Sequence, residues 1–223
     1  MSNIPEPLKE SWNSFSKDRA RTYLKTFGHP SIPSKKMLTD LLLKESRNGF
    51  VDILRGSSFK KKISILELGC GNAQLYEYFK ERGLLCDYTG VDFSETLLEA
   101  AKENNPEATF ICDNVEELKK VTSTYDFVIY SHVIEMLSSP EASLLRAKEL
   151  AKKIIIRFFE PPVFEVDAVE LKMMETAEGL KVPYLRRKMS KDYYKMILDK
   201  MKCTKIDVHH PEHAKDEIHM LHY

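Results

Sequence analysis

Short apolar runs alternate with segments of helical periodicity from about residue 63 to the end of the chain. Five of the apolar runs have the length of a β-strand: ISILELG, YTGVD, TFICD, YDFVIYS and KIIIRFF. The first run has Ile and Leu at odd and even positions, as a parallel strand buried on both faces has. This alternation predicts βαβ units around a mostly parallel sheet. At the end of the chain, the polar stretch PEHAKD separates KIDVHH from EIHMLHY, which predicts an antiparallel hairpin.

The segments between these runs carry helix signals. Ser94 can N-cap a helix through LLEAAKEN, and Gly83 is placed to end the preceding helix in a left-handed conformation. Further helices are expected from Pro140 to Ala151 and over SKDYYKMILDKM. We therefore expect an α/β fold with a Rossmann-like, seven-stranded, mostly parallel sheet, an antiparallel last strand and an N-terminal helical cap.

Two segments lie outside this alternation. The first, residues 7 to about 55, has two helical patterns separated by FGHPSIP, whose glycine and prolines disfavour a continued helix. The second is an insertion after the fifth strand. Because ligands bind beyond the carboxyl ends of the strands in open α/β sheets, both segments are candidates to roof that edge. We expect one domain divided into an N-terminal helical lid (1–55), a cofactor-binding core (56–160), a substrate-side insertion (161–189), and a last helix with its hairpin (190–223).

Composition limits the classes of partner. The 223 residues, 43% of them hydrophobic, suffice for one substantial core. Lys plus Arg and Asp plus Glu balance at 34 each, so no nucleic-acid partner is expected, since phosphate binding usually leaves a basic footprint. The four cysteines show no CxxC spacing, the N-terminus lacks a secretory signal, and no apolar run reaches the ~20 residues of a membrane helix. We expect a cytoplasmic protein with free thiols and no membrane contact.

The strongest chemical signal is the run from Glu67 to Ala73, ELGCGNA, between the first strand and its helix. Gly69 and Gly71 permit a tight turn and close approach of a ligand to the backbone, and the helix N-terminus presents unpaired amides. Asp92 ends the second strand 21 residues after Gly71, where a carboxylate can accept both hydroxyls of a ribose.

An NAD enzyme uses the same turn and the same ribose acid, so the dinucleotide interpretation has to be weighed. Gln74 stands where the third glycine of GxGxxG belongs, and Glu67 before the turn can reach a cationic group of a ligand. S-adenosylmethionine carries an ammonium group and a sulfonium and has no pyrophosphate. The sequence therefore favours S-adenosylmethionine over NAD.

The ordered motifs ILELGCGNA, TGVDFS, FICDN and YDFVIYSHVIEML resemble those of class I S-adenosylmethionine-dependent methyltransferases of the small-molecule type. Residues 63 to 137 carry the resemblance closely, and the terminal hairpin fits the family's antiparallel last strand. The resemblance implies S-adenosylmethionine as cofactor and S-adenosylhomocysteine as its product.

Carried over residue by residue, the resemblance implies a cofactor site. Its methionine part would lie at Glu67 and the glycine turn, its ribose at Asp92, and its adenine beside Phe93, with Asp113 and Asn114 contacting the adenine. Ser131 and His132 would flank the reaction centre, and Arg19 and Tyr23 of the N-terminal helix would reach the cofactor carboxylate. The cofactor-binding set is thus Arg19, Tyr23, Glu67, Gly69, Cys70, Gly71, Asn72, Asp92, Phe93, Asp113, Asn114 and Ser131.

The acceptor side is less marked in the sequence. His132 is the leading candidate for a general base, with a merely hydrogen-bonding histidine as the open alternative. Arginines suit a carboxylate or phosphate, although a solvated charge run explains the same residues. His209, His210 and His213 resemble a metal cluster, but neighbours on a strand point to opposite faces, so no metal site is expected. The expected substrate-binding residues are His29, Arg157, Glu160, Tyr184, Arg187 and His210.

These patterns predict an enzyme that transfers the methyl group of S-adenosylmethionine to oxygen or nitrogen of a small, polar and, in one interpretation, anionic metabolite. Two alternatives stay open at this point: an NAD-dependent oxidoreductase, and a non-catalytic S-adenosylmethionine-binding protein. The identity of the acceptor and the oligomeric state are not encoded in any pattern that we find.

Overall fold

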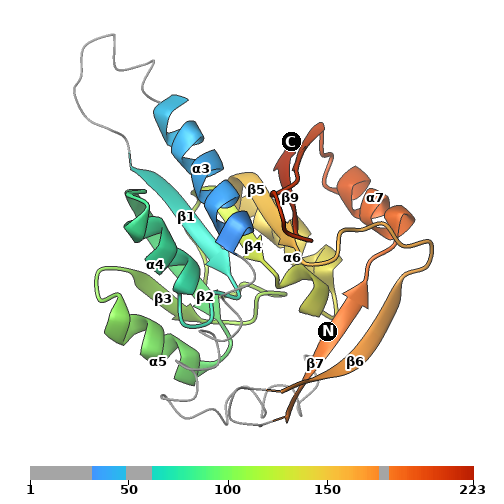
Figure 1. Ribbon diagram of the computed structural model, residues 1–223, viewed down its shortest axis with the longest axis horizontal. Coiled ribbons are helices and arrows are strands. Elements are labelled where there is room, and N and C mark those ends of the chain that lie inside the picture. The colour runs from blue at the N-terminus through green and yellow to red at the C-terminus, as the bar shows by residue number, and fades with distance from the viewer. Residues whose placement is uncertain (1–31, 49–61, 176–180) are drawn as a thin grey trace.

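The computed structural model describes residues 32–48, 62–175 and 181–223. Within these ranges the chain forms an α/β fold with a seven-stranded sheet (Figure 1). In chain order the elements are α3 (Ile32–Asn48), β1 (Ile63–Leu68), α4 (Gln74–Glu81), β2 (Cys86–Asp92), α5 (Glu95–Asn104), β3 (Thr109–Cys112), β4 (Tyr125–Ser131), the 3₁₀ helix η3 (Ile134–Met136), α6 (Pro140–Leu150), β5 (Ala151–Phe158), β6 (Ala168–Glu175), β7 (Lys181–Lys188), α7 (Lys191–Lys200), β8 (Lys205–His209) and β9 (Glu217–His222).

The sheet has the strand order β3-β2-β1-β4-β5-β9-β8. Strands β1 to β5 run parallel to one another, whereas β9 runs antiparallel to both β5 and β8. This confirms the predicted mostly parallel sheet and the terminal hairpin. It also brings the carboxyl ends of β1, β2, β4 and β5 to one edge.

Helices cover both faces of the sheet, and the central strands β1, β4 and β5 contribute alternate side chains to two cores (Figure 1). One core packs Leu66 and Leu68 of β1 with residues of α6 and α7. The other packs Ile63 and Ile65 of the same strand with residues of α3, α4 and α5. Burial on both faces explains why the parallel strands are apolar at successive positions.

Helix ends follow the sequence signals. The hydroxyl of Ser94 accepts a hydrogen bond from Leu97 N at 3.4 Å, which confirms the predicted N-cap. Gly83 follows Arg82, the C-cap of α4, and has φ 73°, as expected of a left-handed helix stop. α3 begins at Ile32, inside the breaker, because Pro33 falls in its first turn and the first amides of a helix need no intrahelical acceptor.

The insertion after β5 forms an antiparallel hairpin, β6 and β7, which is a two-stranded sheet of its own. It extends away from the main sheet, and β7 packs against η3 (Figure 1). A bridge between Phe164 and Ser190 joins the two ends of the insertion. Among the described residues, no helix is both long enough and apolar enough to cross a membrane.

Candidate functional site

The turn after β1 is built from left-handed residues. Gly69 has φ 72°, Gly71 has φ 54° and Ala73, the N-cap of α4, has φ 64°. The amides of Gly69 and Cys70 donate to Val91 O at 2.7 and 3.0 Å, which holds the turn against the end of β2. A Cβ atom on Gly69 would overlap Val133 Cγ2, so this position requires glycine for space as well as for conformation.

Asp92 ends β2 beside this turn. Its Oδ2 accepts from Gly71 N and its Oδ1 from Ser94 N, both at 2.9 Å. Burial raises the pKa of this carboxyl group, and the backbone hydrogen bonds oppose the rise. The predicted ribose acid therefore also joins the glycine turn to the start of α5.

Glu67 lies at the end of β1 and is buried. Its Oε2 accepts from the Tyr88 hydroxyl at 2.5 Å. Burial raises the pKa of Glu67 to about 7, although Tyr88, Arg157 and Lys35 all lower it. A carboxylate of this kind gains stability when a cationic ligand group binds beside it.

Asp113 and Asn114 form the loop after β3. The carboxylate of Asp113 accepts from Asn114 N at 2.8 Å and from Lys120 N at 2.7 Å. Asn114 Oδ1 accepts from Glu116 N at 2.9 Å. Both side chains thus shape their own loop, and their contacts with adenine stay a prediction.

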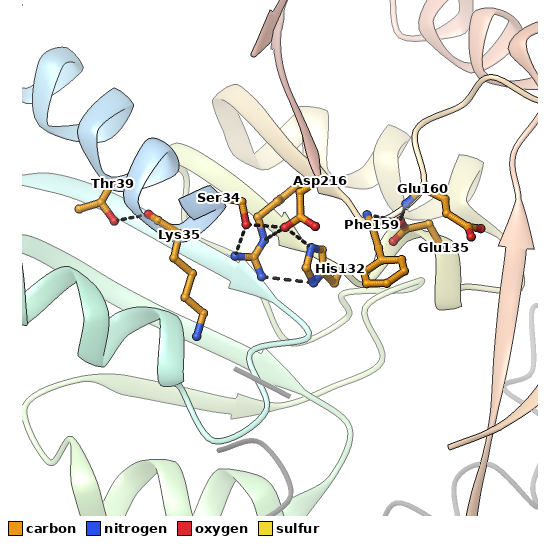
Figure 2. A network of polar contacts seen from close by, with 9 residues as sticks. Ser34, Lys35, Thr39, His132, Glu135, Phe159, Glu160 and Asp216 are labelled. Carbon is orange, nitrogen blue, oxygen red and sulfur yellow. Dashed lines mark hydrogen bonds and ion pairs between the residues drawn. The ribbon is translucent and has the colours of Figure 1, made fainter. Parts of the chain in front are cut away.

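A buried polar network lies over the ends of β4 and β5 (Figure 2). His132, which follows β4 with φ 60°, places Nε2 2.9 Å from Asp216 Oδ2 and Nδ1 3.3 Å from Arg157 Nη2. The Ser34 hydroxyl of α3 donates to the same Asp216 carboxylate, and Arg157 Nη1 lies 3.4 Å from Ser34 Oγ. The network joins α3, β4, β5 and the turn before β9. A left-handed, non-glycine residue in such a network indicates a functional position.

The partners of His132 determine its protonation. Arg157 can only donate, so Nδ1 accepts; the Asp216 carboxylate can only accept, so Nε2 carries the proton. Burial and the nearby Arg157 lower the pKa of His132 to about 4, which keeps the ring neutral at pH 7. Neither nitrogen then has a free lone pair for a substrate proton. The arrangement favours the hydrogen-bonding alternative over the predicted role of general base.

Replacing His132 with asparagine tests this arrangement through stability. The unfolded chain binds a proton near pH 6.5 and the folded chain only near pH 4, so the unfolded state binds more protons between these values. Wild-type stability relative to the variant should therefore rise from pH 4 to pH 6.5, by at most about 3 kcal/mol. Urea unfolding at about pH 5 and about pH 7 measures it, and an equal difference at both would contradict the neutral ring.

Arg186, Phe159 and Glu135 form the neighbouring wall. The Arg186 guanidinium lies 4.3 Å from the centre of the Phe159 ring, and the Phe159 and His132 rings form an edge-to-face pair with centroids 5.6 Å apart. Glu135 Oε1 accepts from Phe159 N and Glu160 N at 2.6 and 3.1 Å (Figure 2). Arg186 Nη2 and Glu135 Oε2 are buried and have no hydrogen-bond partner among the described residues. A polar ligand would satisfy such atoms.

The other residues predicted to bind the acceptor do not form one cluster. Arg157 belongs to the His132 network, and Glu160 lies 3.4 Å from Arg186 Nε. Arg187 donates to the Asp167 carboxylate and, at 3.0 Å, to Ser138 O, so it fastens the hairpin rather than facing the reaction centre. His210 is exposed, 3.6 Å from Glu217.

Some predictions fall where the structure gives no test. Arg19, Tyr23 and His29 lie outside the described residues, and for Tyr184 only the backbone within β7 is described. Ser131 is half-buried and pairs in register with Arg157. No group of three potential metal ligands occurs in the described ranges.

Sequence reasoning missed Ser34, Lys35, Tyr88, Glu135 and Asp216. Lys35 is the most informative of these, because burial lowers the pKa of its ammonium group and Arg157 lowers it further, while Glu67 raises it. Its side chain points from α3 toward the edge where β1 ends (Figure 2). The described residues offer Lys35 no ion pair. No local motif marks these residues, since most act through partners far away along the chain.

Comparisons with known proteins agree with this geometry. Residues 66–154 match a family model described as a methyltransferase domain. The chain is 27% identical over 140 residues to a malonyl-[acyl-carrier protein] O-methyltransferase of Priestia megaterium, a match that covers 62% of this chain and 46% of that protein. Matched segments span about a third to about half of such curated relatives, 34% and 46% in two cases.

Two solved structures share the fold. DesVI of Streptomyces venezuelae superposes with a TM-score of 0.66 at 12% identity, over 93% of this chain and 99% of that one. The magnesium protoporphyrin IX methyltransferase of Synechocystis PCC 6803, solved with bound S-adenosylmethionine, gives 0.57 at 13% identity, over 98% and 90% of the two chains. At these identities the likeness concerns the fold.

Proposed function

We propose that this chain, which belongs to the class I S-adenosylmethionine-dependent methyltransferases, transfers a methyl group to oxygen or nitrogen of a small polar acceptor. The observation that carries the proposal is the left-handed glycine turn after β1, closed by the buried Asp92 carboxylate. Several curated relatives are named for an acceptor on a carrier protein, so a carrier-linked acceptor is the second candidate.

The residues present fit the cofactor. Glu67 offers a buried anion to the ammonium group, and Lys35 offers a cation without a counter-ion in the described chain to the carboxylate. Asp92 has lone pairs left for ribose hydroxyls, and Gly69 and Gly71 leave room for the backbone to approach the methionine part. Bound S-adenosylmethionine supplies a sulfonium-activated methyl carbon, so alignment of the acceptor provides much of the catalysis.

The chain's own residues would bind and orient the acceptor. We assign the wall formed by His132, Phe159 and Arg186 to the acceptor side, since it stands beside Ser131 at the end of β4. His132 acts as a positioning residue, held by Asp216 and Arg157. The unpaired Arg186 Nη2 and Glu135 Oε2 suit a ligand with both a hydrogen-bond acceptor and a donor. These two groups make the acceptor side polar, and an anionic acceptor would bind through Arg186.

Arg186 and Arg187 are a natural pair of variants. Arg186→Ala should raise the KM for the acceptor about tenfold without changing cofactor affinity, because it removes one charge-assisted hydrogen bond. Arg187→Ala should instead lower stability by about 1 to 3 kcal/mol, since the part-buried contacts of Arg187 with Asp167 and Ser138 are lost. Steady-state kinetics and urea unfolding separate the two. If instead Arg187→Ala raised the KM and Arg186→Ala only lowered stability, the acceptor site would lie at Arg187.

The proposed activity is tested with S-adenosylmethionine labelled in its methyl group. The protein is incubated with a cell extract split into a small-molecule fraction and a macromolecular fraction. Label in the small-molecule fraction is expected. Label only on a carrier protein would favour the second candidate, and binding of the cofactor without transfer to either fraction would indicate a non-catalytic binding protein.

A further inference from the structure

Tyr88 lies beneath the cofactor site and takes no part in the roles assigned so far. It stands on β2, opposite Ile65 of β1. Glu67 lies opposite Gly90, two residues further along β2. The Tyr88 ring is buried, stacked on Tyr76 with centroids 4.3 Å apart. Its hydroxyl donates to Glu67 Oε2 at 2.5 Å. A buried tyrosine hydroxyl that donates to a carboxylate stabilises the ionised form of that carboxylate.

We propose that Tyr88 is a positioning residue for the cofactor, whose hydroxyl orients the Glu67 carboxylate and keeps it ionised for the cofactor's ammonium group. This inference rests on the proposed function and deepens it. It makes uptake of the amino-acid end of the cofactor depend on a proton, because protonated Glu67 cannot form the ion pair. Binding below neutral pH then requires that Glu67 release its proton to solvent.

Several groups face Glu67 and set the pH range of this effect. Lys35 from α3 and Arg157 from β5 favour the charged carboxylate, while Asp92 at the end of β2 disfavours it. Cys70, in the turn, is buried and its pKa is raised well above its ordinary value, so it stays neutral. Together with burial these influences leave the pKa of Glu67 at about 7.

The two ionisation states of Glu67 are therefore close in free energy at neutral pH, and one hydrogen bond can decide between them. Tyr88→Phe removes that hydrogen bond but keeps the stacked ring, so the pKa of Glu67 should rise further. Each pKa unit lowers cofactor affinity tenfold at a pH well below the pKa, and has no effect well above it.

The experiment is calorimetric titration of the full chain with S-adenosylhomocysteine and, separately, 5′-methylthioadenosine, which lacks the amino-acid end. For Tyr88→Phe, affinity for S-adenosylhomocysteine should fall about tenfold at about pH 6 and stay within about threefold of wild type at about pH 8.5. Affinity for methylthioadenosine should not change. Tyr76→Phe is the matched control, because its hydroxyl faces the exposed Glu107 and not Glu67.

An equal loss at every pH, or no loss, would overturn the inference, since a structural tyrosine would not move the pH profile. The wild type gives a second readout that needs no variant. Near pH 7, binding of S-adenosylhomocysteine should release a fraction of a proton, measured in buffers of different ionisation heat, and methylthioadenosine should release none. Absence of proton release also overturns it. If the wild type binds neither compound, the proposed function itself fails.

Discussion

Asp92→Ala should lower the affinity for S-adenosylhomocysteine at least about a hundredfold, because two charge-assisted hydrogen bonds to ribose, worth about 1.5 to 3 kcal/mol each, are lost. The structure adds a second reason. The same carboxylate accepts from Gly71 N and Ser94 N, so its loss also loosens the glycine turn. Calorimetry measures the affinity, and circular dichroism verifies that the fold persists.

Asp87→Ala is the matched control for this variant. Asp87 lies on the same strand, but its side chain is exposed and pairs only with Lys62, at 3.0 Å, among its described contacts. Affinity in this control should stay at the wild-type value. If Asp92→Ala also bound S-adenosylhomocysteine like wild type, the ribose assignment would be wrong.

Gly69→Ala should destabilise the fold by about 2 to 5 kcal/mol, the sum of left-handed backbone strain and overpacking. The added Cβ would overlap Val133 Cγ2 and lie 2.9 Å from Val133 Cγ1. Either the turn or the segment after His132 has to shift, so cofactor affinity should fall more than about tenfold as well.

Two further variants separate the causes of this loss. Gly83→Ala has nearly the same backbone angle, φ 73°, but no atom within 4 Å of its added Cβ. It should cost only the backbone strain, about 1 to 2 kcal/mol. Val133→Ala combined with Gly69→Ala should recover the steric part of the loss. Equal unfolding midpoints for Gly69→Ala and Gly83→Ala in urea would contradict the steric explanation.

The fold followed from the sequence because its signals are local. Strands β1, β4 and β5 are apolar at successive positions, and Ser94 and Gly83 mark helix ends by their own chemistry. The turn after β1 could also be predicted. Its backbone requires glycine at two left-handed positions, and the acid that holds it ends the next strand. The β6–β7 hairpin was missed because Pro183 and a run of charges obscure the period of its strands.

The acceptor side could not be read in this way because its contacts join distant parts of the chain. Asp216 and Ser34 are separated by 182 residues, and His132 meets Asp216 across 84. The sequence predicts the terminal hairpin but not that Asp216, in the turn before β9, reaches the site, where it contacts His132 and Ser34. The residue that reaches the site is Asp216, whereas His210 points to solvent and pairs with Glu217. Which acid of a polar turn reaches inward depends on packing that no local pattern encodes.

A calorimetric comparison of S-adenosylhomocysteine with NAD on the full wild-type chain tests most directly whether the turn after β1 binds S-adenosylmethionine. Glu67 and Lys35 flank the place assigned to an amino-acid moiety, and Asp92 the place assigned to a ribose. We expect saturable, one-to-one binding of S-adenosylhomocysteine with an affinity in the micromolar range or tighter, and no heat of binding with NAD. Binding of NAD without binding of S-adenosylhomocysteine would contradict this expectation.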